Sequence, residues 1–226
     1  MTIEEHFDGE FIVEPEFISD QLKQIKAFIF DWDGVFNTGE KNAEGHSTFN
    51  EVDSMGTNLL RLNHYLRNKE CPFSAVITGE NNKISFLFSE REHFHSVYFN
   101  AKNKRIAVEH FCRMYSLQPK EICFVFDDVL DFSVAEIVGI RIMVGRKATS
   151  LLREFAVSNN LVDYITASNG GAYAIRETTE LLMALSEIYD ETIEHRMKFT
   201  DKYQTYIKER NSIVTKFYGP EDISVK

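Results

Sequence analysis

The chain has 226 residues, 43% of them hydrophobic, which is enough apolar surface for one good-sized core and makes a single α/β domain the default. Its 25 basic and 35 acidic residues give a formal net charge of −10, so nucleic acid and anionic membranes are poor partners. Cys71, Cys112 and Cys123 lie far apart with no CxxC pair, and no stretch resembles a signal peptide or a membrane span. These features favour a reducing, cytoplasmic compartment.

Residues 1–24 form an acidic N-terminal extension. Its first 22 residues contain no Lys or Arg, and the sequence Glu14-Pro15-Glu16 marks a break before the main domain. Phe7, Phe11, Ile12 and Phe17 predict that this extension wraps the domain, and nothing in it suggests catalysis.

Short apolar runs rich in β-branched and aromatic residues predict strands at 27–31, 73–78, 95–99, 122–127 and 140–144. Helical patterns separate them, at 56–67, 81–90, 103–115, 132–137 and 148–155. Alternation of this kind predicts a parallel sheet with right-handed crossovers and helices on both faces. The expected fold is therefore a three-layer α/β/α sandwich of the Rossmann-like type.

Residues 178–226 form a long helical extension at the C-terminal end. From 178 to about 217, apolar residues recur at three- and four-residue steps, with one break near Thr200. This amphipathic stripe either packs onto the chain's own domain or forms a subunit interface, and the pattern leaves both open.

Polar residues follow four successive predicted strands. They are Asp31 and Asp33 after the first strand, Thr78, Gly79 and Glu80 after the second, Lys102 and Lys104 after the third, and Asp127, Asp128 and Asp131 after the fourth. Open α/β sheets bind ligands at the carboxyl ends of their strands, so we expect these residues to form one site.

The chemistry of this set is narrow. Carboxylates brought together from two strands repel each other unless a cation lies between them, and hard oxygen ligands suit Mg²⁺. The metal and a lysine can together neutralise a phosphoryl group, and a carboxylate can attack phosphorus to give an aspartyl phosphate. The sequence thus predicts phosphoryl chemistry.

The pattern DxDG after an apolar strand, then Thr, then Lys, then DDxxD, resembles the haloacid dehalogenase superfamily of phosphohydrolases. The stretches "FNEVDSMGTNLL", "AVITGE", "NAKNKRIAVEHF", "FVFDDVLDFSV" and "ASNGGAYAIRE" are similar, in order and spacing, to its capless branch of 3-deoxy-D-manno-octulosonate 8-phosphate phosphatases. The resemblance covers residues 25 to about 185, and it implies a phosphatase domain over 25–177.

The resemblance implies a role for each matching residue. Asp31 would be the nucleophile and Asp33 the general acid, while Thr78 and Lys104 would contact the phosphoryl group. Mg²⁺ would be held by the Asp31 carboxylate, the Asp33 backbone carbonyl and Asp127. A second set would support the site: Asp128 and Asp131 behind the metal, and Gly79, Glu80 and Asn103 at the substrate.

The resemblance also implies a β-hairpin after the first strand, here "NTGEKNAEGHSTF" with its turn near residues 42–45, which packs against a neighbouring subunit in a tetramer. We therefore expect a homo-oligomer.

Several positions depart from the family pattern. Glu80, Val52 and Ala172 stand where relatives carry positive groups, Ser54 replaces a glycine, and Phe126 replaces the glycine before the acidic cluster. The lost cations argue against a carboxylated ulosonic acid phosphate and predict an altered substrate.

The sequence favours a Mg²⁺-dependent phosphomonoesterase that acts on a small phosphorylated metabolite, a sugar phosphate by resemblance, through an aspartyl phosphate. The alternative is a catalytically silent relative that serves as a binding or assembly protein. Receiver domains use similar residues in a different strand order, and a phosphotransferase would need a water-excluding cap that the sequence does not display.

Overall fold

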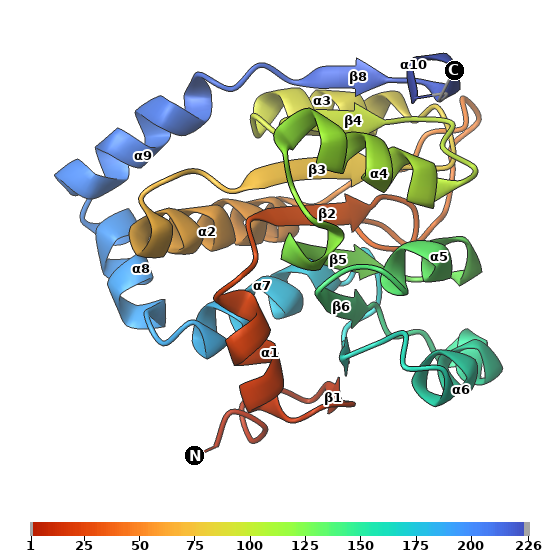
Figure 1. The fold of residues 1–226 in the computed structure, drawn as a ribbon, viewed down its shortest axis with the longest axis horizontal. Helices are drawn as coiled ribbons and strands as arrows, with labels where there is room; N and C mark the ends of the chain where they lie inside the picture. The colour runs from red at the N-terminus through yellow and green to blue at the C-terminus, as the bar shows by residue number, and fades with distance from the viewer. Residues whose placement is uncertain (1, 224–226) are drawn as a thin grey trace.

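The computed structural model describes residues 2–223, and within this range eight strands form one sheet in the order β1-β7-β6-β5-β2-β3-β4-β8 (Figure 1). All neighbouring strands are parallel except β1 and β7. The strands are β1 (Glu10–Phe11), β2 (Ala27–Asp31), β3 (Phe73–Ile77), β4 (Ser96–Tyr98), β5 (Ile122–Phe126), β6 (Ile140–Met143), β7 (Tyr164–Ile165) and β8 (Lys216–Tyr218). The predicted α/β fold is confirmed, and β2 to β6 occupy the predicted positions.

Helices cover both faces of this sheet, as the three-layer prediction requires (Figure 1). One face packs against α1 (Pro15–Leu22), α2 (Glu51–Asn68), α3 (Lys83–Arg91) and α7 (Ala174–Leu185). The other packs against α4 (Lys104–Tyr115), α5 (Phe132–Ala135), α6 (Ser150–Ser158) and α10 (Pro220–Ile223). Helices α8 (Tyr189–Met197) and α9 (Asp201–Asn211) contact α2, and 3₁₀ turns lie at Pro119–Glu121, Val129–Asp131 and Lys147–Thr149.

The central strand β2 explains why the sheet needs both helical layers. Phe28 and Phe30 point into one hydrophobic cluster, and Ala27 and Ile29 point into the other, because successive side chains of a strand alternate between its faces. All four are buried. A strand that is apolar on both faces is typical of a parallel sheet covered on both sides.

The N-terminal segment contacts the core directly. Strand β1 pairs antiparallel with β7 at the sheet edge, and α1 begins at Pro15, a residue suited to the first turn of a helix. Ile18 and Leu22 of α1 are buried in the main hydrophobic cluster. The segment therefore packs on the domain, and its treatment as a separate extension ending at residue 24 stays a prediction.

The C-terminal segment corrects one expectation. Its helical pattern divides into α7, α8 and α9, and residues 216–218, predicted as the end of a helix, instead form the edge strand β8 parallel to β4. Tyr203 and Tyr206 of α9 pack against Leu62, Tyr65 and Leu66 of α2. The stripe thus packs on the chain's own domain, and a subunit interface stays a prediction.

The prediction of a β-hairpin after β2 is wrong, because residues 37–50 contain no strand. A turn does lie at the expected place: the backbone N–H of Asn42 donates to the carbonyl of His46 at 2.9 Å, and that of Gly45 donates to Asn42 at 3.0 Å. The segment's polar side chains contact the loop after β2 instead of a pairing partner. We call residues 37–50 the flap loop.

Among residues 2–223, none of the helices combines the length and apolar character needed to cross a bilayer.

Candidate active site

A cleft of about 430 Å³ lies at the carboxyl ends of the parallel strands. Segments that follow β2, β3, β4, β5 and β6 meet there. Its lining residues are Asp31, Asp33, Gly34, Gly39, Lys41, Gly79, Glu80, Lys102, Lys104, Asp127, Asp128, Val129, Leu130, Asp131 and Arg146. The predicted convergence of strand ends is therefore present in the fold.

The loop after β2 is anchored by an aromatic side chain between its two aspartates. Trp32 is fully buried and stacks on Phe36, with ring centroids 4.9 Å apart, while Asp31 and Asp33 line the cleft. Asn37 fixes the turn, because its side-chain oxygen accepts from the backbone N–H groups of Gly34 at 3.2 Å and Gly39 at 2.9 Å. The DxD spacing thus directs two carboxylates to the site and one indole to the core.

Glycines allow this loop to pack closely. Gly34 has a φ of +84°, and a Cβ there would lie 2.1 Å from a carboxylate oxygen of Asp127. A Cβ on Gly170 would lie 1.9 Å from the Gly34 carbonyl oxygen. The "NGG" motif before α7 therefore packs directly against the loop after β2, which gives a structural reason for its place in the sequence.

Lys104 connects two of the buried carboxylates. Its Nζ lies 2.7 Å from Oδ1 of Asp31 and 2.5 Å from Oδ1 of Asp131, and all three side chains are less than one tenth exposed. Burial opposes its charge, but the two carboxylates raise the pKa of Lys104 above its usual range. The lysine at the start of α4 is therefore held as a cation next to Asp31.

Asp31, Asp127 and Asp131 offer carboxylate oxygens within 4.8 Å of one another. Burial raises the pKa of Asp31 to about 6; Lys104 opposes this rise in part, and Asp127 adds a smaller rise. Burial and Asp131 raise the pKa of Asp127 to about 6, and burial and Asp31 raise that of Asp131 to about 7. The ionised cluster therefore carries uncompensated charge, and a hard divalent cation fits this donor set.

The loop after β5 is shaped by the acidic residues themselves. The side chain of Asp128 accepts from the Val129 N–H at 2.6 Å, and that of Asp131 accepts from the Asp128 N–H at 3.3 Å. This reciprocal cap starts the 3₁₀ turn and leaves the other oxygen of Asp131 to Lys104. Asp128 itself is exposed on the cleft rim.

Asp33 is held by the flap loop. The hydroxyl of Ser47 donates to Oδ1 of Asp33, and Nζ of Lys41 lies 2.9 Å from Oδ2. Asn82, which caps the start of α3, donates from Nδ2 to the Ser47 hydroxyl at 2.6 Å. Ser47 and Asn82 are both buried, so a continuous buried hydrogen-bond chain fixes the second aspartate.

The remaining predicted residues differ in how far they are buried. Thr78 is fully buried behind the cleft, and its hydroxyl accepts from the Glu80 N–H at 3.3 Å. Gly79 and Glu80 line the cleft, and the exposed carboxylate of Glu80 pairs with Lys102 at 2.7 Å. Asn103 is exposed just before α4 and is not among the lining residues. A substrate contact by Asn103 stays a prediction.

Sequence reasoning missed three residues that contact the acidic groups: Lys41, Ser47 and Arg146. Arg146 follows β6, and its guanidinium lies 2.6 Å from Oδ2 of Asp127. The end of the fifth predicted strand, "MVGR", carries the same signal as the other four strand ends, a polar residue after an apolar strand. Lys41 and Ser47 carried no such signal, because they lie in the flap loop, whose path only the fold defines.

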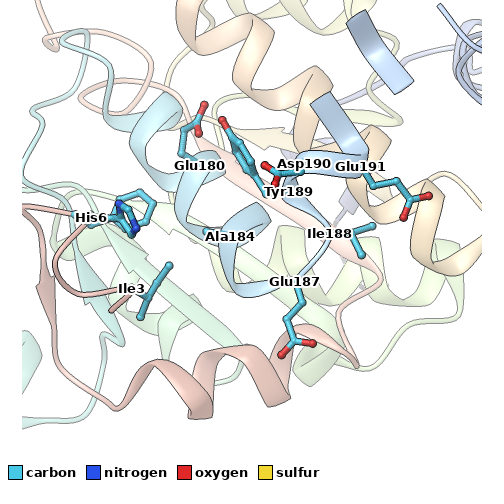
Figure 2. A pocket seen from close by; sticks show the side chains of 10 residues that line it. Ile3, His6, Glu180, Ala184, Glu187, Ile188, Tyr189, Asp190 and Glu191 are labelled. Carbon is cyan, nitrogen blue, oxygen red and sulfur yellow. The ribbon is translucent and has the colours of Figure 1, made fainter. Parts of the chain in front are cut away.

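A second and larger cavity, of about 850 Å³, lies between the N-terminal segment and the α7–α8 junction (Figure 2). Side chains of Glu180, Glu187, Asp190 and Glu191 surround it, with Ile3 and His6 opposite. Helix α8 lies at the end of the sheet away from the strand arrowheads (Figure 1). This cavity is therefore separate from the cleft that holds Asp31.

The chain is similar in sequence and in fold to known phosphatases and hydrolases. No model of a known protein family matches the chain. The chain is 27% identical over 175 residues to the 3-deoxy-D-manno-octulosonate 8-phosphate phosphatase KdsC of Escherichia coli K12, a match covering 76% of this chain and 86% of that protein. It is 24% identical over 163 residues to the KdsC of Yersinia pestis, covering 70% and 80%.

Solved structures agree. A protein from Legionella pneumophila assigned to haloacid dehalogenase subfamily III A superposes with a TM-score of 0.67 at 25% identity, covering 81% of this chain and 95% of its own. One from Vibrio cholerae assigned as an octulosonate 8-phosphate phosphatase gives 0.63 at 26%, covering 77% and 92%. The Moraxella catarrhalis phosphatase, solved with magnesium, phosphate and KDO, gives 0.64 at 24%, covering 81% and 98%.

In its fold, its cleft and its sequence, the chain is similar to proteins of the haloacid dehalogenase superfamily. Its matches lie in the branch that contains the KdsC proteins, as the motifs indicated.

Proposed function

We propose that this protein is a Mg²⁺-dependent phosphomonoesterase that acts on a small sugar phosphate through an aspartyl phosphate at Asp31. The observation that carries the proposal is the contact between Asp31 and the buried Lys104 in a cleft that Asp33 and Asp127 also line. A nucleophile, a second carboxylate, a cation and a metal-ligand set from separate strand ends suit this reaction and few others.

In the first step, a carboxylate oxygen of Asp31 bonds to phosphorus while the bond from phosphorus to the leaving oxygen breaks. Asp33 gives its proton to that oxygen, so the alcohol departs neutral. In the second step, Asp33 takes a proton from water, the water oxygen attacks phosphorus, and Asp31 is released as a carboxylate. Lys104 orients Asp31 and offsets charge on the phosphoryl oxygens. Ser47 and Lys41 hold Asp33 within reach of both proton transfers.

Asp31, Asp127 and the backbone carbonyl of Asp33 would hold the metal, with Asp131 and Asp128 supporting them. When bound, Mg²⁺ would neutralise the carboxylate cluster and polarise the phosphoryl group. The close approach of the three buried carboxylates, whose oxygens lie within 4.8 Å of one another, supports a cation at this position. Thr78, Gly79, Glu80 and Asn103 are our proposed phosphoryl and substrate contacts.

The relatives' printed substrate, 3-deoxy-D-manno-octulosonate 8-phosphate, makes a phosphorylated sugar the first substrate class to test. The predicted change of substrate is retained, because Glu80 brings a negative charge to the cleft and Val52 is an exposed apolar residue. Phe126 is fully buried in β5, which makes it a packing residue rather than a substrate contact.

A catalytically silent binding protein is not favoured, because such a protein would have no need for the buried Lys104 between Asp31 and Asp131. We also infer a cytoplasmic location and a homo-oligomer, a tetramer by resemblance to the family.

The test is phosphate release from p-nitrophenyl phosphate and a phosphosugar panel, with and without Mg²⁺, for the wild type and Asp31→Asn. Metal-dependent turnover that the substitution abolishes supports the proposal. No release from any ester by the wild type would sink it and favour the silent binding protein. A wide preference for octulosonate 8-phosphate would overturn only the predicted change of substrate.

A further inference from the structure

Arg146 lies on the solvent side of a buried carboxylate in the candidate metal cluster. Its guanidinium is 2.6 Å from Oδ2 of Asp127, and its side chain is 31% exposed while that of Asp127 is 4% exposed. The arginine therefore shields Asp127 from water, and unlike the buried Lys104 its side chain is open to solvent on one side.

The absence of a side chain at Gly34 leaves room for the contact between Arg146 and Asp127. A Cβ built on Gly34 would lie 2.1 Å from Oδ2 of Asp127 and 2.5 Å from the guanidinium nitrogen of Arg146. Asp31, Asp127 and Arg146 line the same cleft, so a phosphoryl group bound at Asp31 would share that cleft with the guanidinium. Arg146 is therefore placed to bind either Asp127 or a phosphoryl oxygen.

Charge makes these two contacts alternatives. Asp31, Asp127 and Asp131 carry three formal negative charges when ionised, and Lys104 and Arg146 carry two positive ones, so −3 + 2 leaves −1. Each positive charge beside the cluster lowers its attraction for a divalent cation, so the contact of Arg146 with Asp127 opposes metal binding. If a phosphoryl dianion draws the guanidinium away, Asp127 regains its full attraction for the metal.

We propose that Arg146 makes metal binding depend on the phosphoryl group: it pairs with Asp127 in the free protein and transfers to phosphoryl oxygens when substrate enters. This inference rests on the proposed phosphatase function. Linkage requires the effect to be reciprocal, so that phosphate tightens metal binding and metal tightens phosphate binding by the same factor.

The experiment measures Mn²⁺ affinity by calorimetry or electron paramagnetic resonance, with and without inorganic phosphate, in the full chain. The variants are Arg146→Gln, Arg146→Lys and, as a control for net charge at the next position, Lys147→Gln. Lys147 is exposed and does not line the cleft. Thermal unfolding of each variant checks that it is folded.

We expect Arg146→Gln to bind Mn²⁺ alone about tenfold more tightly, to bind phosphate more weakly, and to lose most of the coupling between them. Arg146→Lys should fall between it and the wild type, and Lys147→Gln should match the wild type. Unchanged or weaker Mn²⁺ binding by Arg146→Gln, with wild-type hydrolysis intact, overturns this inference alone. A wild type that neither binds Mn²⁺ nor hydrolyses esters overturns the proposed function as well.

Discussion

The ammonium of Lys104 lies 2.7 Å from the carboxylate of Asp31, and both side chains are almost completely buried. The lysine also lies 2.5 Å from Asp131, so one cation orients the proposed nucleophile and stabilises the aspartate behind it. Burying a charged pair is costly unless its geometry and hydrogen bonds are good, which suggests that this arrangement is retained for chemistry.

Lys104→Met should reduce turnover by about 10²–10³-fold, because it removes a preorganised charge beside the phosphoryl group. It should also lower the free energy of unfolding by about 3–5 kcal/mol, because it leaves buried carboxylates unpaired. Steady-state kinetics and thermal unfolding measure the two effects. Lys102→Met is the matched control: Lys102 is 69% exposed and forms an exposed ion pair with Glu80, so a comparable loss in that variant would contradict the assignment.

Ser47→Ala should lower kcat while leaving the fold intact, because it breaks the chain from Asn82 through Ser47 to Asp33. A hydrogen bond to a charged group contributes about 1.5–3 kcal/mol, so the expected loss is about tenfold or more in kcat. Thr48→Ala, at the exposed neighbouring position, is the control. Equal kinetics for both variants would mean that Ser47 does not position the general acid.

Metal should stabilise the protein more at pH 8 than at pH 5.5. The pKa of Asp131 is raised to about 7 in the fold, from about 4 in an unfolded chain, so the folded state binds this proton more tightly. Its contribution to stability is therefore present at acid pH and lost as pH rises through 7. Mg²⁺ replaces the missing proton charge, which predicts a larger rise in Tm at pH 8.

Thermal unfolding with and without Mg²⁺ at the two pH values checks this prediction. Asp131→Asn should reduce the difference, since it removes one of the three carboxyl groups whose raised pKa lies between the two pH values. The same Mg²⁺-induced rise at both pH values in the wild type would argue against a cation among these carboxylates.

Tyr206→Ala should destabilise the monomer itself. Tyr206 of α9 is 1% exposed, packs on Tyr65 with ring centroids 5.4 Å apart and donates to the Asn58 carbonyl at 3.3 Å. Removing a buried aromatic ring costs about 3–5 kcal/mol. Denaturant unfolding at two protein concentrations measures the loss, and Met197→Ala, at a position 64% exposed, is the control. A loss that depended on protein concentration would instead place Tyr206 in a subunit interface.

The central fold and most of the cleft could be predicted because their signals are local. Strand β2 is apolar on both faces, and Asp31 and Asp33 interrupt that pattern where the strand leaves the core. Thr78 and Asp127 likewise follow apolar strands, and a parallel sheet brings such strand ends to one edge. The order of strand ends was therefore sufficient to bring Asp31, Asp127 and one of two lysines together, and the family resemblance selected Lys104.

The parts that escaped prediction depend on long-range contacts. Strand β8 has three residues, and only its pairing with β4 makes it a strand. Ser47 lies in a polar segment whose pattern does not distinguish a hairpin from a loop, and its contact with Asp33 depends on Asn82 of α3. Asp131 also contacts Lys104 directly in the structure, whereas the resemblance implied only a supporting role behind the metal.

The decisive experiment for an aspartyl phosphate at Asp31 is to trap the phosphoryl enzyme. The wild type is mixed with Mg²⁺ and a phosphate ester that it hydrolyses. The reaction is quenched in acid within the first turnovers, and the digested protein is examined by mass spectrometry. We predict one added phosphoryl group on the peptide that carries Asp31, lost on treatment with hydroxylamine and absent from Asp31→Asn. A phosphoryl group on another residue, or an Asp31→Asn variant that turns over like the wild type, would contradict it.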